Sequence, residues 1–487
     1  GVLVNNPLLP DWRHLDELLL GGYWATAAGS STPVSIYRPV VSLSYFLQVQ
    51  TLNRPGAFHA LNVLLHGSVA LTLLSLLRRW LKPQTALVAA LLFAVHPVQC
   101  EAVVRVASRP DLLCALFLLT AWGLLEDRKL LAAAGAYALA LGSLECAVVF
   151  PAVYAAFVHW RRGPDGDRRE FTTVAALGLL VVGYLGLRGA LLEGPLIRGG
   201  TPYFGGVSAW VKFLTLARFW AECYLWPLIS GFGIFLDPVR PFFPDAAPKD
   251  PVAIALLLGW TALAGGSLWA AFQRRAWGFW ALFAALFLLP TSHLLFRYDT
   301  LGAQRFLYLP SIAVFILAAS ALEKIRTPLV AAALILWFSG RTLALEGAWK
   351  DQRTYWTAVL AQCPGSSPAH NSLGVVMAQE GDLAGAEKNF ERAIALAPGR
   401  PEGYYNLAKL RFDAGRLDEA AARAELARTA YPKEPENLVL LALIAERRGQ
   451  AERARAETQE YPTGPDGQDL EHLPDGGFEK VVETRAA

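Results

Sequence analysis

Long apolar runs separated by short polar connections fill the first 345 residues, and beyond them apolar and charged positions mix as in a soluble helical protein. A helix needs about 20 apolar residues to cross a bilayer. The pattern therefore predicts an all-α protein, with a membrane bundle first and a soluble helical region after a boundary near Gly347. The expected spans are 58–81, 84–97, 110–125, 130–144, 146–160, 171–191, 251–272, 276–290, 306–322 and 327–345. The segment 84–97 is short enough to be a buried or re-entrant helix instead, which leaves the number of spans open by one or two.

The first 57 residues have the composition of a loop outside the membrane. Asn5-Asn6-Pro7 and Gly21-Gly22 are turn signals within it. A short amphipathic run from Pro39 to Leu52 predicts a helix that lies on the membrane surface. Because the chain starts at Gly1 within loop-like sequence, we expect further residues to precede it.

Basic residues in the short connections give the expected orientation, since loops rich in Lys and Arg stay in the cytoplasm. The connections 78–82, 128–129 and 161–169 carry such residues and fall on one side of the expected bundle. The side that contains 1–57 and 98–109 is then extracytoplasmic.

Whether the connections after residue 228 agree with this orientation depends on whether the stretch 207–228 crosses the membrane. Charged residues interrupt it, and two of them, Arg218 and Glu222, are four apart, as in a helical ion pair. Charged side chains are costly in hydrocarbon, so we expect an interfacial helix here rather than a span. The basic residues at 274–275 and 324–326 then also face the cytoplasm, and the chain leaves the membrane after residue 345 on the extracytoplasmic side.

A repeat with a period of 34 residues follows the last expected span. Pro364, Pro398 and Pro432 have this spacing, and a glycine series and an alanine series keep it too. The strings at 371–398 and 405–432 resemble tetratricopeptide repeats, with Gly374 or Ala408 where paired helices approach closely.

Stacked repeats of this kind build a core between neighbours and leave a concave groove. We expect the repeat domain to cover 347–462, before a loose tail at 463–487 and after a membrane domain at 58–346. The repeats are either a passive spacer or a groove for an acceptor protein or peptide, and we favour the groove.

Composition narrows the class of protein. Hydrophobic residues make up 54% and charged residues 17% of the 487-residue chain, which excludes both a wholly soluble globule and a disordered chain. The net charge of +3 does not indicate a nucleic-acid partner. The 5 cysteines show no metal-ligand spacing, so we expect neither a disulfide framework nor a zinc site.

Polar residues near the ends of the expected spans gather on the extracytoplasmic side. Polar groups at a membrane edge cost free energy unless they are satisfied, so such clusters need a reason. The residues concerned are Arg38, His59, Asn62, His66, His96, Glu101, Arg105, Arg109, Asp111, Glu145, Arg188, His293, Arg297, Asp299, Gln304 and Arg305.

Each cluster also has an ordinary explanation. His59 and His66 are more simply partners of neighbouring helices, and Glu101 with Arg105 is an i,i+4 pair. Arg297 would then contact lipid phosphate. The convergence of arginines, carboxylates and histidines on one face nevertheless favours a site for a phosphorylated lipid.

At these residues the sequence resembles the transmembrane and tetratricopeptide-repeat protein family, which is related to protein O-mannosyltransferases of the GT-C glycosyltransferase superfamily. The resemblance implies a GT-C-like bundle, a polyprenyl-phosphate sugar as donor, and a protein hydroxyl as acceptor on the luminal or periplasmic side. The matching strings are NNP at 5–7, YRP at 37–39, FHALNVLLH at 58–66, ALLFAVHPVQCEAV at 90–103, SRPDLL at 108–113, SLECAVVFP at 143–151 and QRFLYLPS at 304–311.

The resemblance also implies roles for single residues. The family's acidic pair, whose Asp we expect to be the base, would lie upstream of Gly1, and the chain has Leu144 and Gln304 where the family commonly has Lys and Glu. Within the chain we expect Glu101 and Asp111 to be catalytic, with Asp11 and Asp16 as the other acidic candidates. The arginines for the donor phosphate are Arg38, Arg109, Arg188 and Arg305, and the further site residues are His96, Glu145 and Tyr308.

The sequence thus predicts a membrane glycosyltransferase that moves a mannose-like hexose to a protein Ser or Thr hydroxyl, with the repeats outside the cytoplasm. The membrane would be the bacterial inner membrane or the endoplasmic reticulum. A nucleotide fingerprint is absent from the sequence and no cofactor is expected, while metal dependence stays open. The alternatives are a lipid-linked oligosaccharide ligase or polymerase, and a non-catalytic scaffold that presents the repeats to protein partners.

Overall fold

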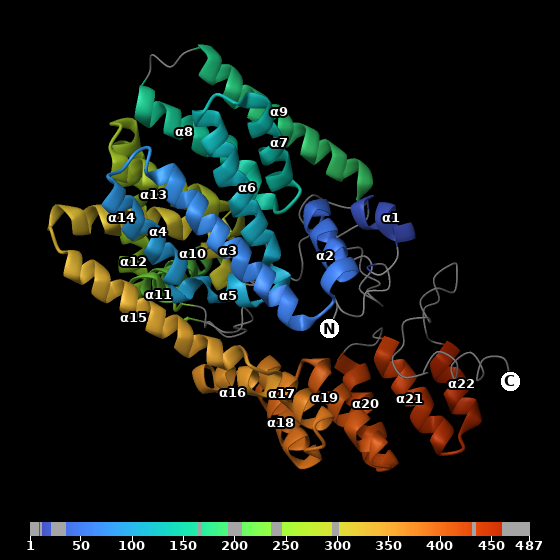
Figure 1. Cartoon of the computed structure of the whole chain (residues 1–487). Helices are drawn as coiled ribbons and strands as arrows, with labels where there is room; N and C mark the ends of the chain where they lie inside the picture. The colour runs from blue at the N-terminus through green and yellow to red at the C-terminus, as the bar shows by residue number, and fades with distance from the viewer. Residues whose placement is uncertain are drawn as a thin grey trace. The chain divides into compact units, whose positions relative to one another are not determined.

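The computed structural model describes residue 9 and residues 12–20, 36–163, 168–192, 207–234, 246–294, 301–430 and 435–459 (Figure 1). All regular structure within these residues is helical, which confirms the all-α prediction. The chain forms two compact units, of which the first ends at Gly347 and the second holds the chain from Ala348 onward.

The first unit contains fifteen α-helices among its described residues. They are α1 (Leu15–Leu20), α2 (Pro39–Leu52), α3 (Pro55–Leu77), α4 (Pro83–Val95), α5 (Cys100–Val104), α6 (Arg109–Glu126), α7 (Leu130–Leu141), α8 (Phe150–Arg162), α9 (Arg168–Leu191), α10 (Ala209–Phe219), α11 (Trp226–Ser230), α12 (Pro251–Phe272), α13 (Ala276–Leu288), α14 (Pro310–Lys324) and α15 (Pro328–Glu346).

Five helices in the described part of this unit are long and apolar enough to cross a membrane. They contain α3, α6, α9, α12 and α15, which match five of the ten expected spans. The expected span 84–97 is a helix that bends by 50° at His96 before continuing as Pro97–Val104, so it is either a broken span or a re-entrant loop. The other four, α7, α8, α13 and α14, are helices of 12 to 15 residues.

Proline and tight turns set the ends of many of these helices. Proline stands in the first turn of α3, α4, α12, α14 and α15, where its fixed φ suits a helix start and its missing N–H costs nothing. Arg128, Arg274 and Arg326 follow the ends of α6, α12 and α14 with left-handed φ angles of 59°, 58° and 52°. These turns reverse the chain within a few residues, so that α6 and α7, α12 and α13, and α14 and α15 pack as neighbouring pairs.

The basic connections meet at one end of the first unit. Arg79 contacts Asp127 at 2.6 Å, Lys82 contacts Glu323 at 2.6 Å and Arg162 lies 3.7 Å from Glu126. Helix α6 begins at Arg109 and ends at Glu126, and its 18 residues span about 27 Å. The other end of α6 is therefore separated from the basic end by nearly the thickness of a bilayer core.

An aromatic cluster around Trp122 fills the centre of the first unit. Trp122 is 2% exposed, and its ring centroid lies 5.0 Å from that of Phe157 and 6.1 Å from that of Phe283. These contacts join α6, α8 and α13. Burial of large aromatic side chains supplies much of the packing free energy of such a bundle.

Two helices expected on the membrane surface are present. Helix α2 begins and ends as predicted, at Pro39 and Leu52, and it buries Tyr45 and Phe46 against the bundle. The stretch 207–228 is helical but not uniform, because a π-helical segment, Trp220–Leu225, separates α10 from α11. The expected ion pair of Arg218 with Glu222 is formed at 3.0 Å.

The second unit consists of seven described helices that pack pair by pair. Gly374 of α17 lies where a Cβ would come within 2.6 Å of the Phe390 ring of α18, which confirms the expected close approach of paired helices. The helices are α16 (Gln352–Gln362), α17 (Ser367–Gln379), α18 (Leu383–Leu396), α19 (Pro401–Asp413), α20 (Leu417–Ala430), α21 (Pro435–Arg447) and α22 (Ala451–Gln459).

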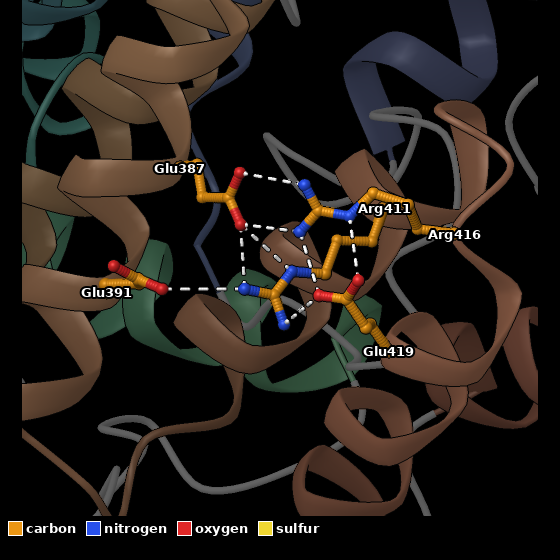
Figure 2. Close-up of polar contacts among 5 residues, drawn as sticks. All are labelled: Glu387, Glu391, Arg411, Arg416 and Glu419. Carbon is orange, nitrogen blue, oxygen red and sulfur yellow. Dashed lines mark hydrogen bonds and ion pairs between the residues drawn. The ribbon is translucent and has the colours of Figure 1, made fainter.

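Two arginines and three glutamates join α18, α19 and α20 (Figure 2). Arg411, whose side chain is 10% exposed, contacts Glu387 at 2.7 Å, Glu391 at 3.5 Å and Glu419 at 3.4 Å. Arg416 contacts Glu387 and Glu419, each at 2.9 Å. We refer to these five residues as the repeat network.

Candidate functional site

Glu101 and Arg305 form the first ion pair of the candidate site. Glu101 stands in the first turn of α5 and is 2% exposed. The Arg305 guanidinium contacts Glu101 Oε1, and the Arg305 backbone N–H donates to Oε2 at 3.1 Å. Arg105 Nη1 lies 3.6 Å from the same carboxylate. Glu101 thus fixes both the side chain and the backbone of Arg305.

Arg38 and Glu145 form the second pair. Arg38 precedes α2, and Glu145 begins the short 3-10 helix Glu145–Val149 after α7. Arg38 Nη2 and Nε donate to Glu145 Oε2 at 2.8 and 3.2 Å. Burial raises the pKa of Glu145, but the charge and hydrogen bonds of Arg38, together with Arg188, outweigh burial and hold this pKa below its ordinary value. Glu145 is therefore a carboxylate at neutral pH.

Asp111 connects the two pairs. It stands in the first turn of α6. The charges of Arg305 and Arg38 both act on it, and so does that of Glu101. The structure therefore places Arg38, Glu101, Asp111, Glu145 and Arg305 in one electrostatic neighbourhood, although they come from five separate segments of the chain.

Tyr308 lies beside this group and is held by His66. The Tyr308 hydroxyl is 2.7 Å from His66 Nδ1, and His66 Nε2 is 3.0 Å from the Ala94 carbonyl oxygen. A carbonyl only accepts, so Nε2 donates to it, and in the neutral imidazole Nδ1 accepts from Tyr308. Asp111 also acts electrostatically on the Tyr308 hydroxyl. His66 is thus a partner of neighbouring helices, as its simpler explanation predicted.

Arg109 points elsewhere, although it is only two residues from Asp111. Its side chain is fully buried and donates to Asn62 Oδ1 at 3.1 Å and to Gln48 Oε1 at 2.6 Å. Its guanidinium carbon also lies 4.3 Å from the centre of the Tyr45 ring. These neutral partners join α6 to α2 and α3.

Arg188 acts on the charged group, whereas the described contacts of His96 are with other residues. Arg188, which is 8% exposed in α9, acts on Glu145 and so belongs with the second pair. His96 instead accepts from the Val98 backbone N–H at 3.1 Å, and its ring packs 4.2 Å from that of Phe338. Its described contacts support the bend between α4 and the following turn.

The remaining candidate residues that the structure describes include His293, His59 and Asp16. His293 Nε2 lies 3.0 Å from the Leu301 carbonyl, while His59 and Asp16 are exposed. Arg297, Asp299 and Asp11 lie outside the described residues. Within the described part of the chain, no three His, Cys, Asp or Glu side chains converge as they would around a metal ion.

Gly302 is a residue that the sequence analysis did not single out. A Cβ at this position would come within 2.6 Å of the Tyr224 hydroxyl and would also collide with the Phe219 ring. Only glycine therefore allows the segment before Arg305 to approach α10 and the π-helical segment so closely. The sequence signal that could have indicated Gly302 is its position three residues before Arg305.

Comparison with known proteins identifies relatives of both units. A tetratricopeptide-repeat family model matches residues 377–444. The protein O-mannosyl-transferase TMTC4 of Mus musculus is 26% identical over 80% of this chain and 62% of its own length. A protein O-mannosyl-transferase of Caenorhabditis elegans is 25% identical over 80% of this chain and 58% of its own length. The human TMTC4 protein is 26% identical over 79% of this chain and 61% of its own length.

The chain spans about three-fifths of the length of these relatives, as the shares of 62%, 58% and 61% show. The matches nevertheless extend over four-fifths of this chain, well beyond the repeats alone. They agree with the resemblance that the sequence motifs indicated. The chain is therefore a homologue of the protein O-mannosyl-transferases of the TMTC family, with candidate membrane spans followed by tetratricopeptide repeats.

Proposed function

We propose that this chain is a membrane glycosyltransferase that moves a mannose-like hexose from a polyprenyl-phosphate donor to a Ser or Thr hydroxyl of an acceptor protein. The observation that carries the proposal is that Arg38 and Arg305, each held by a glutamate, both act electrostatically on Asp111 at one end of the bundle. Guanidinium groups bind phosphate oxygens well, and a carboxylate on which they act can receive a proton. The names of the relatives support the same reaction class.

In the proposed reaction Asp111 accepts a proton, and Arg38 and Arg305 bind the phosphate. The bond between the anomeric carbon and the donor phosphate oxygen breaks, and its electron pair leaves with the lipid phosphate. The acceptor oxygen bonds to the anomeric carbon and loses its proton to Asp111. The phosphate changes from a diester to a monoester and gains negative charge, so Arg38 and Arg305 bind it more strongly as the transition state forms.

Glu101 and Glu145 hold the two arginines in place rather than react. Both carboxylates already receive hydrogen bonds from an arginine, and Glu101 also accepts the Arg305 backbone N–H. Such pairing keeps each guanidinium in position in a site that excludes much of the water. Arg188 strengthens the second pair, and Tyr308, fixed by His66, limits the space beside Asp111.

The basic end of the bundle supports an orientation. Short connections rich in Lys and Arg stay in the cytoplasm, and here several of them contact one another. Asp111 stands at the opposite end of α6, so the reaction would occur on the extracytoplasmic side. The repeats would present the acceptor protein on that side, because solenoids of this type bind peptides in their groove.

A transfer assay on the full chain in liposomes tests the proposal. With radiolabelled polyprenyl-phosphate mannose and a Ser/Thr-rich acceptor peptide, we expect Arg38→Ala and Arg305→Ala each to lower the rate about 100-fold or more. Arg78→Ala, an exposed arginine at the basic end, is the control and should leave the rate unchanged. Transfer only from a pyrophosphate-linked glycan would favour the ligase or polymerase instead, and unaltered cellular function in both site variants would favour the scaffold.

A further inference from the structure

A shallow pocket lined by aromatic side chains lies open to solvent at the start of the second unit. Trp349, Tyr355 and Trp356 form its walls together with Asp351 and Gln352, and its volume is about 450 Å³. The ring centroids of Trp349 and Tyr355 are 4.7 Å apart with the planes at 49°. Those of Tyr355 and Trp356 are 4.9 Å apart at 78°. Neighbouring rings thus contact each other at an angle rather than lying parallel. We call these five residues the aromatic pocket.

The aromatic pocket carries one acidic group. Asp351 caps α16, since its Oδ1 accepts from the Thr354 backbone N–H at 2.7 Å. This hydrogen bond lowers the pKa of Asp351, so the side chain is negative at neutral pH. The neighbouring Lys350 acts on Asp351 electrostatically. Arg353 is engaged by Glu380 at 2.6 Å and by Asp382 at 3.4 Å.

The pocket lies next to a candidate membrane span along the chain. The span Pro328–Trp349 ends with the first aromatic residue of the pocket, and Asp351 follows two residues later. Two residues of extended chain reach at most about 7 Å. If this helix crosses the bilayer, Asp351 cannot be far from the headgroup layer, which is also the depth that Trp and Tyr side chains prefer.

We propose that the aromatic pocket binds the ammonium headgroup of a zwitterionic phospholipid, such as phosphatidylcholine. Aromatic faces attract a cation through the ring quadrupole, and choline-like cations are typically held by several such faces. A single carboxylate adds charge complementarity. A neutral ligand could use the aromatic faces but would gain nothing from the exposed Asp351 charge. The site does not depend on the proposed sugar transfer.

Substitutions in the pocket separate charge, aromatic surface and folding. Asp351→Asn removes the negative charge but keeps an N-cap, because Asn and Asp cap helices about equally well. Trp356→Phe keeps an aromatic face, while Trp356→Leu removes it. Asp382→Asn is the matched control, since Asp382 also caps a helix, by accepting from the Gly385 N–H at 3.0 Å, but does not line the pocket.

The experiment uses the full chain in nanodiscs that contain equal amounts of phosphatidylcholine and phosphatidylglycerol. Native mass spectrometry then gives the ratio of the two lipids that stay bound when the bilayer is stripped away. For the unaltered chain, Trp356→Phe and Asp382→Asn we expect phosphatidylcholine to be enriched about threefold. Asp351→Asn and Trp356→Leu should bring the ratio close to that of the bilayer, with unchanged circular dichroism.

Two results would overturn the proposal. One is the same lipid ratio in the unaltered chain and in both Asp351→Asn and Trp356→Leu. The other is displacement of the bound lipid, in the unaltered chain alone, by a micromolar lysine-containing peptide. That result would assign the pocket to a peptide ammonium group instead of a lipid.

Discussion

The membrane unit and the repeats both join arginines to carboxylates, but over different distances along the chain. Arg305 and Glu101 are 204 residues apart, and Arg38 and Glu145 are 107 apart. In the repeat network the partners lie only 3 to 29 residues apart. The repeat network is therefore a local feature of two neighbouring repeats, whereas the site depends on the whole bundle.

The two groups also differ in how their carboxylates are used. In the repeat network every glutamate shares an ion pair with Arg411 or Arg416 (Figure 2). In the membrane unit Glu101 and Glu145 are paired in the same way, but Asp111 is shared electrostatically between both arginines. The comparison indicates that pairing alone stabilises structure, while a carboxylate on which two held cations act electrostatically is suited to chemistry.

The largest effect should come from removing that shared carboxylate. We expect Asp111→Asn to lower the transfer rate about 100-fold or more, because general acid–base catalysis contributes factors of this size. Thermal unfolding of the variant should change little, since the amide keeps the shape of the side chain. Glu391→Gln in the repeat network is the control, with an unchanged rate. An active Asp111→Asn variant would remove the distinction between the two groups.

A smaller effect is expected in the repeat network. Arg411→Ala would leave three glutamates with Arg416 as their remaining cation from the network. Because the glutamates are partly exposed, solvent screens much of the repulsion, and the expected loss of stability is about 1–2 kcal/mol. Hydrogen exchange of α18 to α20 in the full chain measures this loss. Arg400→Ala, which breaks an exposed pair with Glu402, should change exchange far less.

The smallest effect concerns pH. Hydrogen bonds from Arg416 and Arg411 lower the pKa of Glu387. A carboxyl whose pKa is lower in the folded state stabilises that state above its unfolded pKa of about 4.3, and this stability is lost as pH falls through the folded value. Protection of α18 and α19 from exchange should therefore fall as the pH drops below about 4.3. Glu387→Gln should flatten this part of the profile, and an unchanged profile would show that the pairing is not coupled to folding.

Hydrophobic pattern and period predicted most of the architecture. The 34-residue spacing located the repeats, and Gly374 indicated where their helices approach. The hydrophobic pattern predicted breaks within helices less well, because a run of apolar residues indicates burial but not the direction of the backbone. The bend at His96 left a signal nonetheless, since a residue before proline disfavours the helical conformation and Pro97 follows.

The site was predicted in part. The motifs named the residues around Asp111, but spacing could not show which charges meet. Arg109 is the clearest case, because its sequence position beside Asp111 suggested a shared role while its buried side chain binds Asn62 and Gln48. Side-chain direction at a helix start depends on the neighbours that the fold supplies, and no local pattern encodes them.

The contact between Glu101 and Arg305 also has a consequence for biogenesis. A ribosome must add 204 further residues after Glu101 before Arg305 exists to neutralise it. Until then the half-exposed Arg105 is its nearby cation in the chain already made, and an acidic side chain that is almost fully enclosed in the mature protein has to remain hydrated or be shielded by the insertion machinery. Truncated products that end before residue 305 should accordingly be recognised by quality-control proteases, even when all of their earlier helices have been inserted.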